Sequence, residues 1–529
     1  MSNGGGKSGG GGKSGGGQSG ARQTNPWLIA PVVAIAAFME VLDISVANVA
    51  LPHIAGDLSA SQDESTWTLT SYLVTNAIVM PISGWLSERF GRKRFFLTCI
   101  AGFTIASFLC GLSINLGMLV VLRAIQGAAG GGLQPTGQAI LTDAFPPEKR
   151  GMATAIYAMA VVFAPAIGPT IGGWITDTYE WRWVFLINVP VGAALIFLIG
   201  FLLHTPGEDA KPNSSKMDWL GLGLISVALG CLQVVMDRGQ EDDWFASGMI
   251  TTLTAASALG FIVLIWWEWS HRNPIVDLQL FKRPDFAIGF VLMLCFGFMI
   301  LGSTYLVPAY AQGLMGYRAT EAGEIIAPGG LLLIVLFPLI GRIVNKIDLR
   351  LMIAFGIIVC GGAVWWMTNF YLDVPFWVLS LGRAMQAVGL AFLFLPINSL
   401  GFRDVPKDRT NYASALINLA RNFGGSIGIS VASTLVTRRE QFHQSRIVEH
   451  LQPLDPAYTN FTSQLSHAMG AAASGQQSIA RVGQLATEQV MLLSYLDVFK
   501  FFGVAFLCLL PLLLFVRRGA ASGGGGAAH

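Results

Sequence analysis

Long apolar runs separated by short polar segments dominate this chain. A helix that crosses a lipid bilayer needs about 20 mostly apolar residues, and fourteen runs of this kind follow one another along the sequence. They lie near 27–50, 67–86, 95–114, 118–138, 152–174, 182–203, 218–236, 245–269, 286–310, 323–344, 351–370, 376–399, 411–436 and 491–516. The pattern predicts an all-α polytopic membrane protein with fourteen transmembrane helices.

The composition agrees with a membrane protein and excludes several other classes. Of the 529 residues, 53% are hydrophobic and 12% are charged, whereas an average globular protein has about 25% charged residues. A net charge of +2 gives no electrostatic reason to expect nucleic-acid binding. The six cysteines all lie in apolar runs without a C-x-x-C pair, which favours small core residues over disulfides or a metal site.

The distribution of lysine and arginine predicts the orientation. If the N-terminus is cytoplasmic, the segments on that side hold 22 of the 33 basic residues and the outside loops hold 7. Basic residues are enriched in cytoplasmic loops, so we expect both termini in the cytoplasm. The remaining four fall inside the expected spans, and they are Arg123, Arg383, Arg421 and Lys500.

A Gly/Ser/Lys-rich stretch opens the chain and resembles a nucleotide-binding loop only superficially. A P-loop requires G-x-x-x-x-G-K-[ST] after a strand, and Lys7 stands where the first glycine of such a motif should precede Gly12-Lys13-Ser14. We therefore interpret residues 1–25 as a flexible cytoplasmic tail. No ATP site, cofactor or metal ligand set is expected, so energy must come from elsewhere.

The chain contains an internal repeat. Arg123-Ala124-Ile125-Gln126-Gly127 recurs 260 residues later as Arg383-Ala384-Met385-Gln386-Ala387. This offset predicts two parallel six-helix halves with a site at their midplane interface, an architecture of secondary transporters. The expected organisation is a flexible tail 1–25, an N-terminal six-helix half 26–204, a linker with two inserted transmembrane helices 205–285, a C-terminal six-helix half 286–518 with a long periplasmic loop 437–490, and a flexible tail 519–529.

Four motifs in the expected order carry a resemblance to a known family. They are Leu42–Pro52 in the first span, Gly84–Arg94 after the second, Arg123–Gly131 in the fourth and Ala164–Gly173 in the fifth. With them the chain resembles the fourteen-span drug:proton antiporters of the major facilitator superfamily (EmrB/QacA type). The resemblance implies the major facilitator fold and export driven by the proton motive force.

Two acidic residues in the first span are the main candidates for proton coupling. A charge near the bilayer centre is costly, so Asp43 and Glu40 are functional candidates by default. Residues three apart share a helix face, and two adjacent carboxyls cannot both ionise cheaply. One of them could therefore load a proton outside and release it inside. The alternative is a purely structural pairing with a basic residue. Glu40 departs from the family, which commonly has an uncharged residue there.

Arg123 is the expected counter-ion of these carboxyls. A guanidinium stays charged and can bind a carboxylate bidentately, and the family assigns a proton-coupling or structural role to the arginine at this position. Gln126 lies one turn further on the same face and can join the same network. Asn48 in the first span is a candidate for substrate or network contact. For Arg383 and Arg421, a structural role is at least as well supported as a functional one.

Two further motifs are expected to act through packing and gating. Small residues allow helices to approach closely, and proline kinks a span; in the resemblance, the fifth span seals the cavity against proton leak with Pro165, Gly168, Pro169, Gly172 and Gly173. The loop after the second span is expected to form a cytoplasmic gating latch, which involves Gly84, Glu88, Arg89, Gly91 and Arg92. The alternative is that its basic residues only contribute to the excess of positive charge in cytoplasmic loops. The family usually has aspartate where Glu88 stands.

The expected function is proton-coupled multidrug efflux of small lipophilic compounds by alternating access across a bacterial inner membrane, a contribution to antibiotic resistance. By resemblance alone, the loop 437–490 would dock a periplasmic membrane-fusion adaptor that connects to an outer-membrane channel. Export of one endogenous metabolite, siderophore or lipid-like molecule is the alternative. A polytopic membrane enzyme is a remote alternative, because H-E-x-x-H, paired-aspartate and G-x-S-x-G signatures are missing.

Overall fold

The structure is a computed structural model that describes residues 25–202, 218–271, 274–449, 451, 456–469, 475–517 and 519. Within these residues the regular secondary structure is entirely helical. The expected tails, apart from Asn25 and Gly519, and most of the segment before the inserted helices lie outside the described residues.

The first six-helix half occupies Pro26 to Leu202. Its fourth and sixth spans are each split in two, and the elements are α1 (Pro26–Asp57), α2 (Gln62–Phe90), α3 (Arg92–Gly111), α4 (Leu116–Gly130), α5 (Leu133–Ala144), α6 (Pro147–Thr178), α7 (Trp183–Leu186) and α8 (Asn188–Leu202). The break between α4 and α5 falls at Gly131 and Gly132, where α4 lies against α2. A Cβ on Gly131 would lie 2.6 Å from the carbonyl oxygen of Asn76, so the close approach requires glycine there.

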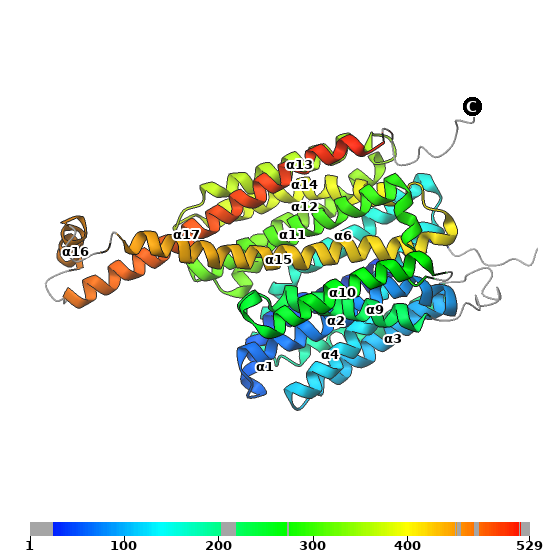
Figure 1. Cartoon of the computed structure of the whole chain (residues 1–529), viewed down its shortest axis with the longest axis horizontal. Coiled ribbons are helices and arrows are strands. Elements are labelled where there is room, and N and C mark those ends of the chain that lie inside the picture. The colour runs from blue at the N-terminus through cyan, green and yellow to red at the C-terminus, as the bar shows by residue number, and fades with distance from the viewer. Residues whose placement is uncertain are drawn as a thin grey trace, which may run out of the picture.

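Two inserted helices and the second half complete the bundle. The inserted helices are α9 (Trp219–Arg238) and α10 (Gly248–Ser270), followed by the short 3-10 helix η2 (Leu278–Lys282). The second half comprises α11 (Pro284–Met315), α12 (Ala319–Ile343), α13 (Leu349–Trp366), α14 (Phe376–Phe402), α15 (Thr410–Val448), α16 (Pro456–Met469), α17 (Gly475–Leu507) and η5 (Leu510–Phe515). Of the two, α9 packs against α2, and α10 packs against α9 (Figure 1).

Thirteen helices of the described part are long and apolar enough to cross a membrane, and α15 runs alongside them in the bundle (Figure 1). The helix α15 is more polar than these thirteen helices. Its first half is buried in protein and therefore tolerates polar side chains. Asn411, Ser414, Asn418 and Arg421 are all buried there, among α2, α5, α11 and α17. With α15 counted, fourteen helices form the bundle, as the sequence predicts.

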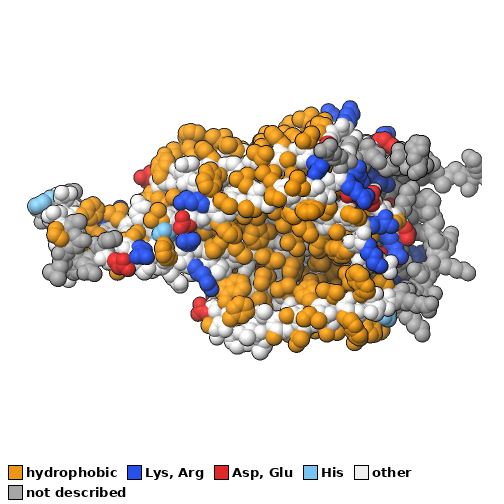
Figure 2. Space-filling view, turned by 45° about the horizontal axis from the view of Figure 1, so that its top comes forward, with side chains coloured by type: hydrophobic (Ala, Val, Ile, Leu, Met, Phe, Trp, Pro, Cys, Tyr) orange, Lys and Arg blue, Asp and Glu red, His pale blue; other side chains and the backbone are white. Residues whose placement is uncertain are grey.

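Helices fill much of the segment 437–490, for which the sequence, rich in Ala, Gln and Ser, predicts an outside loop able to form helices. The bundle helix α15 continues to Val448, α16 spans Pro456–Met469, and α17 begins at Gly475. They project from one end of the bundle, which we call the α16 end; the opposite end, where η5 lies, is called the terminal end (Figure 1). Figure 2 shows hydrophobic side chains along the flank of the molecule and a gathering of lysine and arginine at the terminal end.

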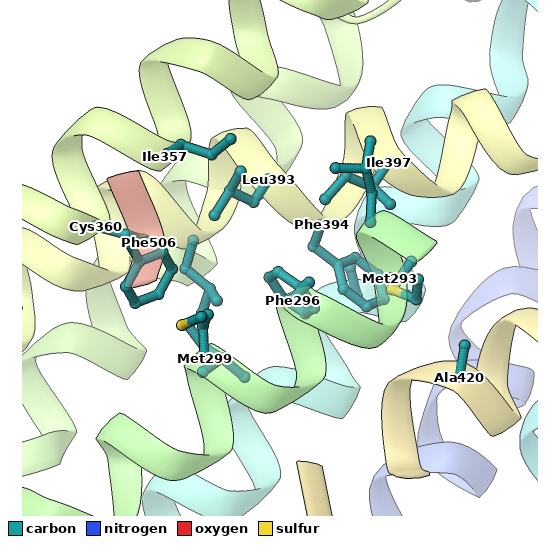
Figure 3. Packing of buried hydrophobic residues seen from close by; sticks show 14 of the residues in the cluster. Met293, Phe296, Met299, Ile357, Cys360, Leu393, Phe394, Ile397, Ala420 and Phe506 are labelled. Atoms are coloured by element: carbon teal, nitrogen blue, oxygen red, sulfur yellow. The ribbon is translucent and has the colours of Figure 1, made fainter. Parts of the chain in front are cut away.

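The two halves touch along α6 and α12 and where α15 meets α2 and α5. Near the terminal end, a Cβ on Gly151 of α6 would lie 2.7 Å from the carbonyl oxygen of Gly341 on α12. The second half has an apolar core in which Phe296 and Phe394 lie side by side, with ring centroids 5.7 Å apart, and Phe506 lies beside Cys360 (Figure 3). Small residues of α6 and α12 lie where the halves meet, and the apolar cluster of the second half continues across this boundary onto Ile82 and Trp85 of α2.

Candidate functional site

Asp43 and Arg123 form an ion pair in the interior of the first half. Asp43 lies on α1 and Arg123 on α4, and Nη1 of Arg123 is 2.6 Å from Oδ2 of Asp43. The Asp43 and Arg123 side chains are completely buried. Because burying either charge alone would be strongly unfavourable, the pair fixes α1 against α4.

Neutral polar groups complete the shell of Asp43. Its Oδ1 accepts hydrogen bonds from Nε2 of Gln126 at 3.0 Å and from Nδ2 of Asn188 at 2.8 Å. Both amides also contact Oγ of Ser107 at 3.1 Å, and Ser107 donates to the carbonyl of Phe185. Asn188 and Ser107 are absent from the sequence-based candidates. Every oxygen of the carboxylate therefore has a donor, which suits an ionised group.

The remaining contacts of Arg123 orient its guanidinium. Its Nε donates to the carbonyl of Thr68 at 3.1 Å and its Nη1 donates to Oε1 of Gln126 at 2.8 Å. The ring of Tyr72 lies 4.2 Å from the guanidinium carbon, a cation–π geometry. Together these contacts leave Arg123 one orientation, toward Asp43.

Glu40 lies one turn before Asp43 and has far fewer partners. Its side chain is fully buried, and Oε1 accepts one hydrogen bond, from Nδ2 of Asn76 at 3.0 Å. Among the described residues, Oε2 has no hydrogen-bond partner and no basic side chain lies within 4.0 Å of the carboxyl. The two carboxyls on α1 are thus held differently: Asp43 forms an ion pair with Arg123, and Glu40 accepts a hydrogen bond from the neutral amide of Asn76.

Arg421 is a basic residue of the second half that lies near Glu40. It lies on α15, and its Nη2 donates to Oε1 of Gln134 on α5, in the first half. Gln134 and Arg421 are both within interaction range of the Glu40 carboxyl. Glu40 therefore lies close to a contact between the two halves, whereas Asp43 lies inside one half.

Asn48 stands apart from this network. It is exposed on α1 and is not one of the hydrogen-bond partners of Asp43. The structure therefore brings together four of the five expected proton-coupling and network residues, namely Glu40, Asp43, Arg123 and Gln126, on neighbouring turns of α1 and α4, and leaves Asn48 outside.

The motif after α2 lies where the two halves meet at the terminal end. Gly91 has φ +84° in the turn between α2 and α3, a conformation that favours glycine. A Cβ on Gly84 would lie 3.2 Å from the Cα of Tyr412 on α15. The Tyr412 hydroxyl donates to Oε2 of Glu88 at 3.2 Å, while Arg92 pairs with Asp143 at the end of α5. Arg89 is half-buried in the last turn of α2.

The small residues of α6 contact both halves. Gly168 lies against the side chain of Ser45 on α1, and a Cβ on Gly172 would lie 3.2 Å from the Cα of Val46. On the other side, a Cβ on Gly173 would lie 2.7 Å from Cγ2 of Thr320 on α12. Pro165 and Pro169 lie within the same helix. The helix therefore packs tightly between α1 and α12.

A set of amides joins the halves on the terminal side of this site. Nε2 of Gln138 on α5 donates to Oδ1 of Asn398 on α14 at 2.9 Å, and these residues are 260 positions apart. Nδ2 of Asn418 on α15 donates to Oε1 of Gln138 at 2.5 Å, and Ser414 donates to the carbonyl of Pro135 at 2.7 Å. The sequence repeat could have pointed to Gln138 and Asn398, which are equivalent positions of the two halves.

No group of three or more His, Cys, Asp or Glu side chains in the described part of the chain is placed to hold a metal ion. Of the histidines beyond the bundle, His443 has its Nε2 2.9 Å from Oδ2 of Asp497, which joins the extensions of α15 and α17. Lys500 lies 3.4 Å from the same carboxyl group.

Comparison with known proteins identifies the family to which the chain belongs. The sequence profile described as Major Facilitator Superfamily matches residues 33–429. The chain is 38% identical over 499 residues to the multidrug export protein EmrB of Escherichia coli strain K12, covering 94% of this chain and 96% of that protein. It is 37% identical over 495 residues to the fatty acid resistance protein FarB of Neisseria gonorrhoeae, covering 93% and 96%.

Solved structures of similar fold are transporters. The human organic anion transporter MFSD10 has a TM-score of 0.58 at 13% identity, covering 92% of this chain and 99% of that one. The proton:xylose symporter XylE has a TM-score of 0.57 at 16% identity, covering 94% and 98%. These likenesses concern the fold, and the sequence relationships define the family. The chain belongs to the major facilitator superfamily and, within it, to the group that contains the EmrB export proteins.

Proposed function

We propose that this protein is a proton-coupled antiporter that exports small lipophilic compounds of varied structure across a bacterial inner membrane. The observation that carries the proposal is the pair of buried acids on one turn of α1. Asp43 is paired with Arg123, and Glu40 accepts a single hydrogen bond, from the neutral side-chain amide of Asn76. The multidrug export proteins to which the chain is similar support the substrate class.

Glu40 is the group that takes up and releases the proton in this account. An ionised carboxylate without a cation is costly inside a membrane, and Glu40 lies near Arg421 of the other half. When the halves move, the distance between Glu40 and Arg421 changes, so proton binding and conformation become coupled. Arg123 stays beside Asp43 throughout, and the ion pair keeps α1 and α4 together.

Alternating access would proceed by rocking of the two halves. Opening at the terminal end must break the contacts of Tyr412 with Gly84 and Glu88 and those of Gln138 with Asn398 and Asn418. The packed face of α6 would then act as the hinge and seal. The exposed Asn48 is our candidate for contact with the substrate.

The orientation and the partners complete the proposal. We place both termini in the cytoplasm, because basic side chains gather at the terminal end (Figure 2). The α16 end then faces the periplasm, and the extensions of α15 and α17 with α16 would dock a membrane-fusion adaptor leading to an outer-membrane channel. Membrane lipids surround the apolar flank. No catalytic reaction is assigned, and the proton gradient alone drives transport.

Export of one endogenous lipid-like molecule is the second candidate. The similarity to a protein named for fatty acid resistance favours it. The two candidates differ in how many unrelated compounds are carried.

A substrate panel in proteoliposomes tests both. Purified protein is reconstituted, a pH gradient is imposed, and the transport of several unrelated lipophilic dyes and of one fatty acid is followed. We expect gradient-dependent transport of several dyes, and its loss in Asp43→Asn. Transport of the fatty acid alone would favour the second candidate, and full activity of Asp43→Asn would contradict the role given to α1.

A further inference from the structure

Arg383 in the second half occupies the position that Arg123 has in the first. The two arginines are 260 residues apart, and the same offset relates Gln126 to Gln386 and Asp43 to Ser303. The repeated sequence therefore keeps the arginine and the glutamine and replaces the carboxylate by a hydroxyl.

The contacts around Arg383 follow the same plan as those around Arg123. Nε2 of Gln386 donates to Oγ of Ser303 at 2.5 Å, just as Nε2 of Gln126 donates to Asp43. Nη1 of Arg383 donates to Oε1 of Gln386, and its Nη2 donates to Oγ1 of Thr304 at 3.0 Å. The arrangement is equivalent to the first-half site with its anion removed.

The charge of Arg383 is consequently uncompensated. Among the described residues no carboxylate lies within 4.0 Å of it, and its Nε has no hydrogen-bond partner. A guanidinium remains charged under all relevant conditions, and an unpaired charge within a membrane span is costly and characteristic of a functional group. Neutral acceptors such as Thr304 and Gln386 orient the guanidinium and leave its charge unmatched.

Arg383 also differs from Arg123 in access. Arg123 is completely buried, whereas Arg383 and its neighbour Thr304 are both partly exposed. The first-half site is closed and internally neutralised. In the second-half site, Ser303 and Gln386 are buried, and the partial exposure lies at the positively charged Arg383 and at Thr304.

We propose that Arg383, oriented by Gln386 and Thr304, binds the carboxylate of a lipophilic carboxylic acid that the protein exports. The inference rests on the proposed transport function and adds a site and an ionic class of substrate to it. The substrate carboxylate would take the place at Arg383 that Asp43 holds at Arg123, with two N–H groups of the guanidinium directed at its two oxygens. The acid would travel as the anion, separately from the proton carried by Glu40.

The test is a binding measurement without a proton gradient. Protein in nanodiscs of phosphatidylcholine, which has no net anionic headgroup, is mixed with radiolabelled decanoate at pH 8, and unlabelled decanoate or neutral decanamide competes for binding. We expect decanoate to bind about tenfold or more tightly than decanamide, as a charge-assisted contact would give. Equal affinities would overturn the proposal.

Two variants at position 303 sharpen the result. Ser303→Asp places a carboxylate of the protein beside Arg383, as Asp43 lies beside Arg123, and should remove the preference for decanoate. Ser303→Asn introduces a neutral side chain of the same size as aspartate, so it should keep the preference for decanoate. A preference that survives Ser303→Asp would contradict the assignment.

Substitutions of the arginine cover the case in which Ser303→Asp does not fold, which gel filtration would reveal. Arg383→Gln should lose the preference for the anion and Arg383→Lys should retain part of it; equal preferences in both would overturn the proposal. Because no gradient is used, the binding of decanoate can be measured even if the protein does not couple transport to protons. Failure of the proposed function can therefore be distinguished from failure of this inference.

Discussion

Replacing Asp43 by asparagine should destabilise the first half severely although the side chains have the same shape. Asp43 Oδ2 accepts from Arg123, and Oδ1 accepts from Gln126 and Asn188. Asparagine offers one oxygen and one NH₂ group, so in either orientation the NH₂ faces donors. Arg123 also keeps its charge with no anion beside it.

The magnitude follows from burial. Breaking a buried ion pair by removing one partner typically costs about 3–5 kcal/mol, and Arg123 and Asp43 are both completely buried. The double variant Asp43→Asn/Arg123→Gln removes the stranded charge as well. We therefore expect it to regain at least about 1–2 kcal/mol relative to Asp43→Asn, because residues in direct contact couple by amounts of this order.

Thermal unfolding of the purified protein in detergent provides the assay. Glu324→Gln is the matched control, since Glu324 is exposed on α12 and its neutralisation should change the stability by less than about 0.5 kcal/mol. The expected order of Tm is wild type and Glu324→Gln highest, the double variant intermediate, and Asp43→Asn lowest. A Tm for Asp43→Asn equal to that of the wild type would refute the reasoning. A double variant less stable than Asp43→Asn would refute it as well.

Three further predictions concern packing, gating and assembly. Gly173→Ala should lower both Tm and transport, because its Cβ would lie 2.7 Å from Thr320, whereas Gly223→Ala, with nothing within 4 Å, should behave as wild type in both measurements. Gly84→Ala forces the Tyr412 contact apart, so cysteine crosslinking between α2 and α15 at the terminal end should decrease; unchanged crosslinking would contradict a gating contact there. Deleting 456–469 should weaken pull-down of a membrane-fusion adaptor and leave dye transport in proteoliposomes intact; loss of transport would show that α16 supports the bundle itself.

An ion pair between Arg123 and a carboxyl of the first span could be predicted from the sequence because charges are rare and costly within spans. The first span has two acids, Glu40 and Asp43, and the fourth span has one arginine, Arg123, so few other partners were available. The sequence did not show which of the two acids Arg123 would bind. The number of spans was equally accessible, because length and apolarity determine it. The 260-residue repeat showed which spans correspond, and the structure places its residues Gln138 and Asn398 in contact across the halves.

The neutral members of the site could not be found in this way. Ser107, Asn76 and Asn188 are neutral polar residues within membrane spans, and such residues often bond to their own helix, so their type says nothing about a distant partner. The sequence of 437–490 is compatible with helices, but the end of α15 at Val448 was equally hidden, because a polar surface helix has no apolar periodicity against lipid. Only the packed arrangement of α1, α2, α3 and α8 brings these side chains to the two carboxyls.

The central claim is that Glu40 carries the proton, and a comparison of two transport modes in Glu40→Gln tests it most directly. In proteoliposomes, efflux driven by a pH gradient requires proton exchange, whereas exchange of labelled for unlabelled dye at equal pH on both sides requires only the movement of the loaded protein. The account predicts that Glu40→Gln loses gradient-driven efflux and retains dye exchange. Gradient-driven efflux at the wild-type rate in Glu40→Gln would contradict it.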